Sequence, residues 1–235
     1  MANFLYSDCN RKTLKMNRIN VVMNDSYEKQ IASFIAAGNV VIGKPEKVLG
    51  DFSLNFQSGK NSSITFSEGC ILNNVSINME NGSGEWKVGK KTYIRGRYFI
   101  GAGSKIEIGD QTAMNRHVLI VATEGASITI GKDCLFSDIT MSTTDWHSII
   151  DDMTGERINP AKCIVIEDSV WLGENVTIQK GITIGKNSII GSKALVTKTI
   201  PPGSLAVGIP AKIIRENVRW QRVLIPMDFL PAEPY

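Results

Sequence analysis

The stretch that decides the fold is IEDSVWLGENVTIQKGITIGKNSIIGSKALVTKTIP, residues 166–201, in which an aliphatic residue returns at every sixth position. The members of this first series are Ile166, Leu172, Ile178, Ile184, Ile190 and Val196. A second series, four places further along each unit, is small or apolar: Val170, Val176, Ile182, Ser188, Ala194 and Ile200. An amphipathic helix needs apolar residues three and four apart, and a strand needs them at every second place. A six-residue step instead predicts a short strand and a corner, repeated as the sides of a parallel β-helix.

The residues between the two series favour corners. They are polar or tolerant of turns: Gly173, Glu174, Asn175, Gly185, Lys186 and Asn187. A looser form of the repeat occurs earlier, in SSITFSEGC (62–70), SKIEIGDQT (104–112) and ASITIGKDC (126–134). We therefore expect an all-β protein whose β-helix spans residues 61–209.

Both ends of the chain depart from this pattern. Residues 1–60 include NDSYEKQIASFIAAG (24–38), where the Asp25/Glu28 spacing and Gly38 predict a short capped helix that covers an end of the solenoid. Residues 210–235 form a third region, in which GIPAKIIRENVRWQR (208–222) is expected to become a helix before a proline-rich tail. One long insertion, residues 142–163, interrupts the coil.

Composition narrows the function classes. The net charge of +3 is spread over 235 residues, and no basic block or basic-aromatic alternation suggests nucleic acid. No apolar run resembles a signal peptide or a membrane span, so we expect a cytoplasmic protein without membrane insertion. The four cysteines form no CxxC pair, which favours reduced thiols and argues against a zinc site. Cys70 and Cys134 fall at inward positions of the repeat.

The insertion carries the most informative side chain. His147 is one of two histidines in the chain, and imidazole is the usual base for removing a proton from a hydroxyl group. By itself, a histidine in a loop is more often a solvated polar residue. Trp171 follows the insertion at what the repeat suggests is a corner, where an indole would pack on a neighbouring subunit or line a ligand slot. The other histidine, His117, is expected at the surface or at the rim of an acceptor site.

Three motifs carry a family resemblance: DWHSI (145–149), VWLGENVTI (170–178) and GSKALVTKTIPPGSLAVGIPAKIIR (191–215). Together they resemble the hexapeptide-repeat acetyltransferases with left-handed parallel β-helices, most closely those that O-acetylate galactosides, capsular polysaccharides and polysialic acid. The resemblance covers about residues 86–220. It implies an acetyl-CoA-dependent sugar O-acetyltransferase without a metal, forming a homotrimer with active sites between subunits. His147 and Trp171, 24 residues apart, match the spacing of the family's catalytic pair.

The resemblance also implies roles for further residues. His147 would be the general base, and Asn115 would lie near the oxyanion. Relative to the family pattern, this sequence has two extra residues after Asn115. An equal alternative is therefore that Asn115 is a corner asparagine in the left-handed conformation. Residues expected along the coenzyme are Trp171, Gly173, Ser192, Thr197 and Lys198, with Lys212 and Arg215 near the adenosine phosphate. For Asp145 there are two expectations: it orients the imidazole, or it caps the loop. Candidate acceptor contacts are Asp145, Trp146, Arg157 and Asn159.

Three alternatives differ in their requirements. A γ-class carbonic anhydrase shares the fold but needs three histidine ligands for zinc, and the chain has two histidines. An N-acetyltransferase of an amino-sugar nucleotide would use the same donor and histidine, so only a test of acceptors separates it. A non-catalytic β-helix trimer would gain no thermal stability from coenzyme A.

Overall fold

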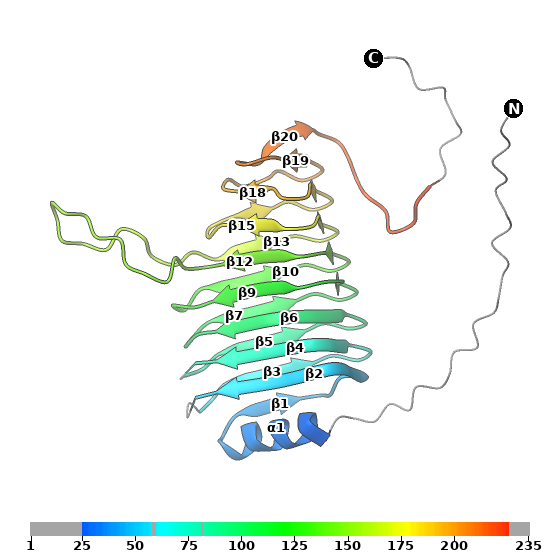
Figure 1. Ribbon diagram of the computed structural model, residues 1–235, viewed down its shortest axis with the longest axis vertical. Coiled ribbons are helices and arrows are strands. Elements are labelled where there is room, and N and C mark those ends of the chain that lie inside the picture. The colour runs from blue at the N-terminus through cyan, green and yellow to red at the C-terminus, as the bar shows by residue number, and fades with distance from the viewer. Residues whose placement is uncertain (1–24, 58–59, 81, 226–235) are drawn as a thin grey trace, which may run out of the picture.

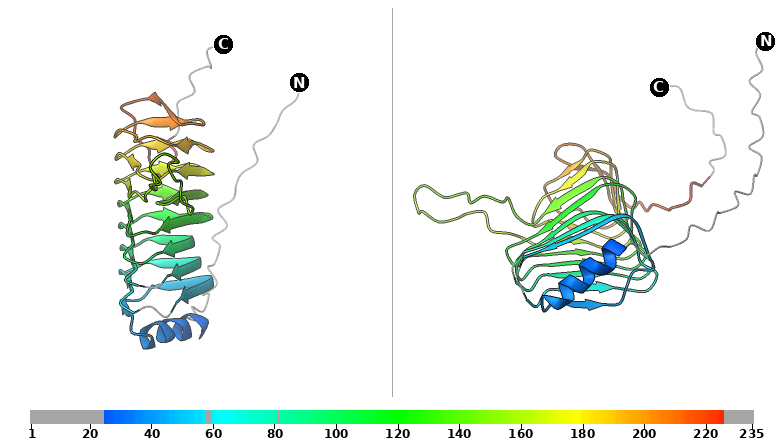
Figure 2. Two further views of the ribbon diagram at one scale, coloured as in Figure 1. Left: turned by 90° about the vertical axis from the view of Figure 1, so that its left-hand side faces the viewer. Right: turned by 60° about the horizontal axis from the view of Figure 1, so that its bottom comes forward.

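The protein is a three-sided parallel β-helix of about seven turns. The computed structural model describes residues 25–57, 60–80 and 82–225. The coils stack in chain order from α1 (Asp25–Ala36) at one end to β20 (Lys212–Arg215) at the other (Figure 1). A view tilted toward the helix axis shows the triangular cross-section (Figure 2). The predicted solenoid architecture is confirmed.

The first face is a seven-stranded parallel sheet. Its strands in spatial order are β1 (Val40–Ile42), β3 (Ser63–Phe66), β5 (Glu85–Val88), β7 (Lys105–Ile108), β10 (Ser127–Ile130), β13 (Ile164–Ile166) and β16 (Thr183–Ile184). Equivalent residues of successive coils pair directly, so that Ile106, Ile128 and Ile164 form one inward column. This column buries branched side chains at the strand spacing, which is the physical meaning of the repeat.

The other two faces consist of short strands in the C-terminal half. The second face holds β8 (Ala113–Met114), β11 (Leu135–Phe136), β14 (Trp171–Leu172), β17 (Ile189–Ile190) and β19 (Leu205–Val207). The third face holds β9 (Val118–Ala122), β12 (Ile139–Ser142), β15 (Val176–Ile178) and β18 (Leu195–Val196). All of these pair in parallel with their counterparts in neighbouring coils, and β20 alone returns antiparallel, against β19.

In the N-terminal half, single strands pass through both the second and third faces. These strands are β2 (Lys47–Phe56), β4 (Ile71–Met79) and β6 (Tyr93–Ile100). β6 pairs with β8 through Tyr93 and with β9 from Arg97 onward, so one strand of this half corresponds to two strands further along the chain. The bend falls at Gly96, which has a φ of +103°. A side chain there would be strained by this φ.

The core confirms the two predicted series. Every residue of both series is buried, with exposed fractions of 0–5%. Ser188, the polar exception, donates its hydroxyl to the Pro201 carbonyl oxygen at 2.8 Å. Asn175 and Asn187 adopt the positive φ expected at corners. Cys70 and Cys134 are fully buried as predicted, and burial raises the pKa of each thiol, to about 11 for Cys70 and about 12 for Cys134.

The N-terminal helix covers the first coil, as predicted. Tyr27 and Phe34 of α1 are buried and make edge contacts with Phe52 and Phe56 of β2, at centroid distances of 4.9 and 5.2 Å. In the described ranges, α1 is the only α-helix, and it is too short and too polar to cross a membrane. Cys9 and the residues after 225 lie outside the described residues.

One predicted boundary and one predicted helix are wrong. The β-helix begins at β1 and β2, inside the region assigned to the cap, because the alternation of this coil lacks the six-residue period that marked the later coils. The predicted C-terminal helix over 208–222 is also absent. Lys212–Arg215 instead form β20, since pairing with β19 satisfies backbone groups at the open end of the sheet.

Candidate active site

The insertion is a hairpin that projects from the corner between the third and first faces. β12 ends at Ser142 and β13 begins at Ile164. The loop closes where the Lys162 amide donates to the Thr143 carbonyl oxygen at 3.0 Å, and an antiparallel bridge joins Ile150 to Arg157. The rest of the loop extends away from the coils (Figure 1). His147 lies on the outgoing limb, close to the root, and is solvent-exposed.

A polar network fixes the root of this hairpin. The Asp145 carboxylate accepts hydrogen bonds from Lys180 Nζ at 2.5 Å and from Asn159 Nδ2 at 2.9 Å. These partners, Lys180 first, hold the pKa of Asp145 below its usual value. Arg157 donates through both terminal nitrogens to Glu124, at 2.8 and 3.0 Å. This bidentate pair, with the Thr144 hydroxyl, lowers the pKa of Glu124 to about 2.

Trp171 lies on the flat second face, and not at a corner as expected from the sequence. β14 has two residues, and the strand period of two turns Leu172 inward and leaves the Trp171 indole 41% exposed. It stands in an outward apolar row with Leu135 and Ile189 of the adjacent strands, which pair with it directly. An exposed indole in such a row is available for ligand or subunit contact.

The C-terminal segment crosses this row. The Trp220 ring centroid lies 6.1 Å from that of Trp171, and Trp220 Nε1 donates to the Ser169 carbonyl oxygen at 2.6 Å. Arg222 anchors the segment on Asp133 at 3.0 Å and lies over the Trp220 ring at 5.5 Å. Between the segment and Trp171 is a hollow of about 590 Å³. No motif in the sequence marks this contact, because its partners are about 50 and 90 residues apart.

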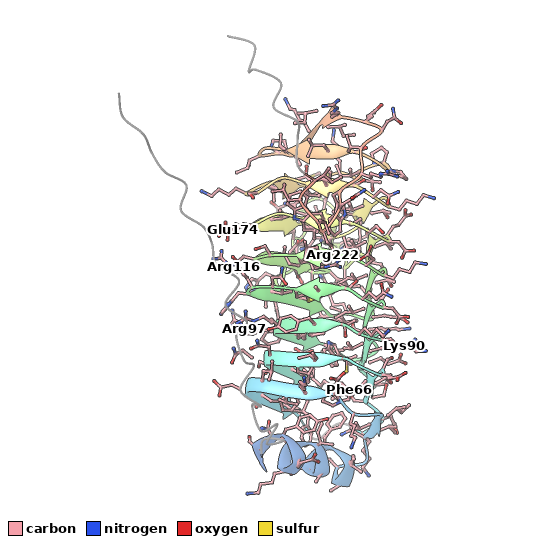
Figure 3. All side chains as sticks on the ribbon, turned by 90° about the vertical axis from the view of Figure 1, so that its right-hand side faces the viewer. Phe66, Lys90, Arg97, Arg116, Glu174 and Arg222 are labelled. Atoms are coloured by element: carbon pink, nitrogen blue, oxygen red, sulfur yellow. The ribbon has the colours of Figure 1, made fainter. Side chains whose placement is uncertain are left out.

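Asn115 and His117 lie at the corner between the second and third faces. Asn115 is exposed and is not one of the residues with positive φ, so it is a corner asparagine without the left-handed conformation. Arg116 beside it pairs with Glu174 at 2.6 Å and with Asp138 at 3.3 Å. Figure 3 shows Arg116 and Glu174 along this edge of the coil. The exposed His117 lines a hollow of about 320 Å³ next to this pair, as expected for a surface or rim residue.

The residues predicted along the coenzyme are spread over three places. Gly173 and Ser192 adjoin on successive coils at the edge beyond Trp171, and a Cβ on Gly173 would lie 2.8 Å from the Ser192 amide nitrogen. Thr197 and Lys198 follow β18 at the corner between the third and first faces. Lys212 and Arg215 are the exposed ends of β20. In the described residues, the side chains of Lys198, Lys212 and Arg215 have no acidic partner within 4 Å.

Within one chain, His147 and Trp171 belong to different sides of the coil. The hairpin leaves at the corner between the third and first faces, whereas Trp171 is on the second face beneath Trp220. In Figure 2, the hairpin and the C-terminal segment leave the triangular section at opposite sides. The fold therefore exposes both residues without joining them.

Residues 163–198 match the family model described as bacterial transferase hexapeptide (six repeats). The matched segment contains Trp171, Gly173 and Ser192 and the coils with the regular six-residue step. This segment of the chain therefore has the repeat of the bacterial hexapeptide transferases.

Curated proteins with names from the same class of enzyme match somewhat more than half of the chain. The chain is 40% identical over 137 residues to the polysialic acid O-acetyltransferase of Escherichia coli O1:K1 / APEC, which covers 58% of this chain and 44% of the relative. It is 35% identical over 130 residues to the galactoside O-acetyltransferase of Escherichia coli strain K12, covering 55% of this chain and 63% of the relative. The chain thus spans about half the length of these curated relatives.

The solved structures of the family extend the likeness to most of the fold. The crystal structure of the polySia-specific acetyltransferase NeuO is similar with a TM-score of 0.61 and 28% identity, over 79% of this chain and 90% of that chain. The polysialic acid O-acetyltransferase OatWY follows with a TM-score of 0.53 and 29% identity, over 80% and 92%. The predicted fold class, a left-handed parallel β-helix, is confirmed.

The sequence missed the residues that surround the predicted ones. Lys180, Glu124 and Trp220 had no motif to mark them, and each contacts the site from a different coil or from the C-terminal segment. A lysine in a corner or a glutamate before a strand is ordinary in this repeat, so only the folded contacts distinguish them.

Proposed function

We propose that this protein transfers an acetyl group from acetyl-CoA to a sugar hydroxyl of a capsular polysaccharide, sialic acid or other surface glycan. The observation that carries the proposal is the exposed His147 at the clamped root of a hairpin, on the fold of the polysialic acid O-acetyltransferases named above. His147 and Trp171 are the residues on which the function depends. The named relatives act on polysialic acid and galactosides, and these are the acceptor classes to examine first.

The proposed reaction is a direct transfer with His147 as general base. Its Nε2 takes the proton of the acceptor hydroxyl while the oxygen attacks the thioester carbonyl carbon. The tetrahedral intermediate collapses, the carbon–sulfur bond breaks, and the imidazolium returns the proton to the departing thiolate. Asn115, exposed at its corner, would donate to the oxyanion. No covalent enzyme intermediate forms, and no metal is required.

The outer surface of the C-terminal coils suits a long anionic donor. Trp171 offers an exposed indole beside the Gly173–Ser192 edge, where the absence of a side chain lets two coils approach closely. Thr197, Lys198, Lys212 and Arg215 add a hydroxyl and exposed cations on the coils beyond it. Ammonium and guanidinium groups are good partners for phosphate oxygens, so these residues would hold the phosphates of the coenzyme.

The separation of His147 from Trp171 supports a site shared between protomers. A hairpin that projects from one corner can contact the second face of a neighbouring chain more readily than that of its own. We propose a homotrimer in which the hairpin of one protomer covers the Trp171 face of the next. The exposed apolar side chains of the hairpin, Ile149 at 52% and Met153 at 93%, would gain burial there.

The proposal is tested by incubating the purified protein with acetyl-CoA and a panel of polysialic acid, galactosides and amino-sugar nucleotides. Release of free thiol and a mass gain of one acetyl group identify the acceptor. Removal of that group by mild alkali marks an ester and separates O-transfer from N-transfer. His147→Ala should lower turnover about 10²–10⁴-fold while coenzyme A still raises its melting temperature.

Two results would overturn the proposal. If no acceptor gains an acetyl group and coenzyme A leaves the melting temperature unchanged, the β-helix has no catalytic role. A monomer by light scattering under assay conditions would remove the shared site. Trp171→Ala is the companion variant, and it should raise the KM for acetyl-CoA as well as lower turnover.

A further inference from the structure

We propose that Asn159 and Lys180 are positioning residues that hold the backbone of residues 145–147 in a strained turn and so fix His147 in its working orientation. This inference rests on the proposed function for the role of His147. The geometry of the turn itself does not depend on that role.

The turn before His147 is unusual. The His147 amide donates to the Asp145 carbonyl oxygen at 2.8 Å, which closes a three-residue γ-turn around Trp146. The φ of Trp146 is +66°, the rare and strained form of this turn. A bulky residue pays a steric cost for positive φ, and such conformations persist only where the surroundings over-determine them. The root of the hairpin must therefore supply the missing stabilisation.

Asn159 provides the central part of it. This residue is 7% exposed, and its side-chain amide makes four hydrogen bonds. Its Oδ1 accepts from the Ile149 amide at 2.8 Å and from Arg157 Nε at 3.2 Å. Its Nδ2 donates to Asp145 Oδ2 at 2.9 Å and to the His147 carbonyl oxygen at 2.8 Å. One side chain thus ties the residue before Trp146 to the residue after it.

Lys180 connects this turn to the rigid coil. Its ammonium group donates to Asp145 Oδ2 at 2.5 Å and to the Asn159 carbonyl oxygen at 3.1 Å. The Lys180 side chain is 17% exposed and the Asp145 side chain 42%, so the ammonium group is largely covered while the carboxylate still meets water. Because Lys180 follows β15 in the next coil, the turn is fixed relative to the β-helix and not only to the hairpin.

Two further contacts flank the turn. The Trp146 indole meets the Phe99 ring of β6 edge-on, with centroids 6.2 Å apart. The Trp146 amide donates to the Thr144 hydroxyl at 3.2 Å, and that hydroxyl donates to Glu124 at 2.7 Å. These contacts converge on residues 144–147, whereas the tip of the hairpin is closed separately, by the amides of residues 153 and 154, which donate to the Asp151 carboxylate.

The substitutions that test this proposal are near-isosteric. Asn159→Asp replaces a donating nitrogen with an oxygen that faces the Asp145 carboxylate and the His147 carbonyl, so two attractions become repulsions. Lys180→Met keeps the stem and removes the ammonium, and Lys180→Arg restores a cation. The matched control is Lys90→Met, because Lys90 is exposed, its side chain makes no hydrogen bond or ion pair with the described residues, and it lies on the edge opposite Glu174 (Figure 3).

The expected result separates turnover from binding. Asn159→Asp and Lys180→Met should lower kcat about 10- to 100-fold, because a misplacement of the base by about 1 Å costs that order of rate. The KM for acetyl-CoA should stay within about twofold, since the coenzyme lies on other residues. Lys180→Arg should recover most of the loss, and Lys90→Met should match the parent. Amide hydrogen exchange of residues 145–149 should rise in the first two variants only.

The outcomes distinguish this inference from the proposed function. If His147→Ala is inactive while Asn159→Asp and Lys180→Met retain full kcat, the positioning role is wrong and the function stands. If the parent protein transfers no acetyl group, the function fails, and hydrogen exchange decides alone. Unchanged exchange at residues 145–149 in both variants would then overturn the proposal that Asn159 and Lys180 hold this turn. Faster exchange than in Lys90→Met would support it.

Discussion

The interior of the β-helix is filled by different side chains in the N-terminal and C-terminal coils. β2, β4 and β6 are continuous strands of 8–10 residues, and their coils enclose Phe52, Phe66, Trp86 and Tyr98. The later coils use strands of two or three residues filled by Ile, Val, Leu and Ala. Large aromatic rings fill the coils with long strands, and branched aliphatic residues fill the coils with short strands. The candidate functional residues lie on the later coils, at their corners and on the hairpin.

The largest effect is expected in the coils with long strands. Trp86 is fully buried between Phe66 and Tyr98, with ring centroids at 5.8 and 5.3 Å. Trp86→Ala should cost about 3–5 kcal/mol of unfolding free energy, because the cavity cannot close within a rigid coil. Ile164 lies in the same inward column, and Ile164→Val should cost about 1 kcal/mol. Urea unfolding followed by circular dichroism measures both, and a Trp86→Ala loss no larger than that of Ile164→Val would contradict the difference.

Bends in the long strands should depend on glycine. A Cβ on Gly96 would lie 2.2 Å from the Val118 carbonyl oxygen and would also meet an unfavourable φ. Gly125 has a similar positive φ of +72° but no atom within 4 Å of such a Cβ. Gly125→Ala should therefore cost about 1–2 kcal/mol, the penalty of the left-handed conformation alone. Gly96→Ala should cost clearly more in the same denaturant titration, and equal costs would exclude the backbone clash as a cause.

In the coils with short strands, two buried serines differ in whether their hydroxyl group makes a hydrogen bond. Ser188 Oγ donates to the Pro201 carbonyl oxygen and accepts from the Ser204 amide at 3.2 Å, whereas Ser204 Oγ has no hydrogen-bond partner. Ser188→Ala should cost about 1–2 kcal/mol, because it leaves the buried Ser204 amide and the partly buried Pro201 carbonyl oxygen without this partner. Ser204→Ala should be neutral or slightly stabilising. Thermal melts of the two variants test this contrast, which fails if both shift the midpoint equally.

The smallest effect is local and depends on pH. Arg157 and Thr144 lower the pKa of Glu124 from 4.5 to about 2, and Asp145 is shifted in the same direction by Lys180 and Asn159. A depressed carboxyl pKa stabilises the folded loop above pH 4.5, and this contribution is lost as the pH falls toward 2. Hydrogen exchange of residues 143–163, corrected for intrinsic rates, should rise over that window before either half of the coil opens. Glu124→Gln should reduce this acid-dependent rise in exchange. If the rise is unchanged in that variant, the Glu124–Arg157 ion pair is not its cause.

The sequence predicted the regular half of the molecule well and the rest in part. Ile166 to Ile200 repeat with a period that one chain geometry satisfies, so both buried series followed from spacing alone. The coil formed by β1 and β2 was missed because its strand carries a bulge between Leu49 and Phe52 and no six-residue step. The C-terminal helix was predicted from local propensity, and pairing of β20 with the open edge of β19 overrode it.

His147 and Trp171 were predicted as site residues from local motifs, since each stands in a short segment with a recognisable pattern. The contacts around these residues could not be predicted in this way, and the sequence suggested Asn159 only as an acceptor contact. Asn159, Lys180 and Glu124 meet the hairpin root across 12–35 residues of chain, and Trp220 reaches Ser169, beside Trp171, across 51. A periodic sequence predicts which side chains face the core, because inward positions recur at each six-residue step of the coil. Which outward side chains meet is set by the stacking of coils and the path of the hairpin, and only the tertiary structure decides it.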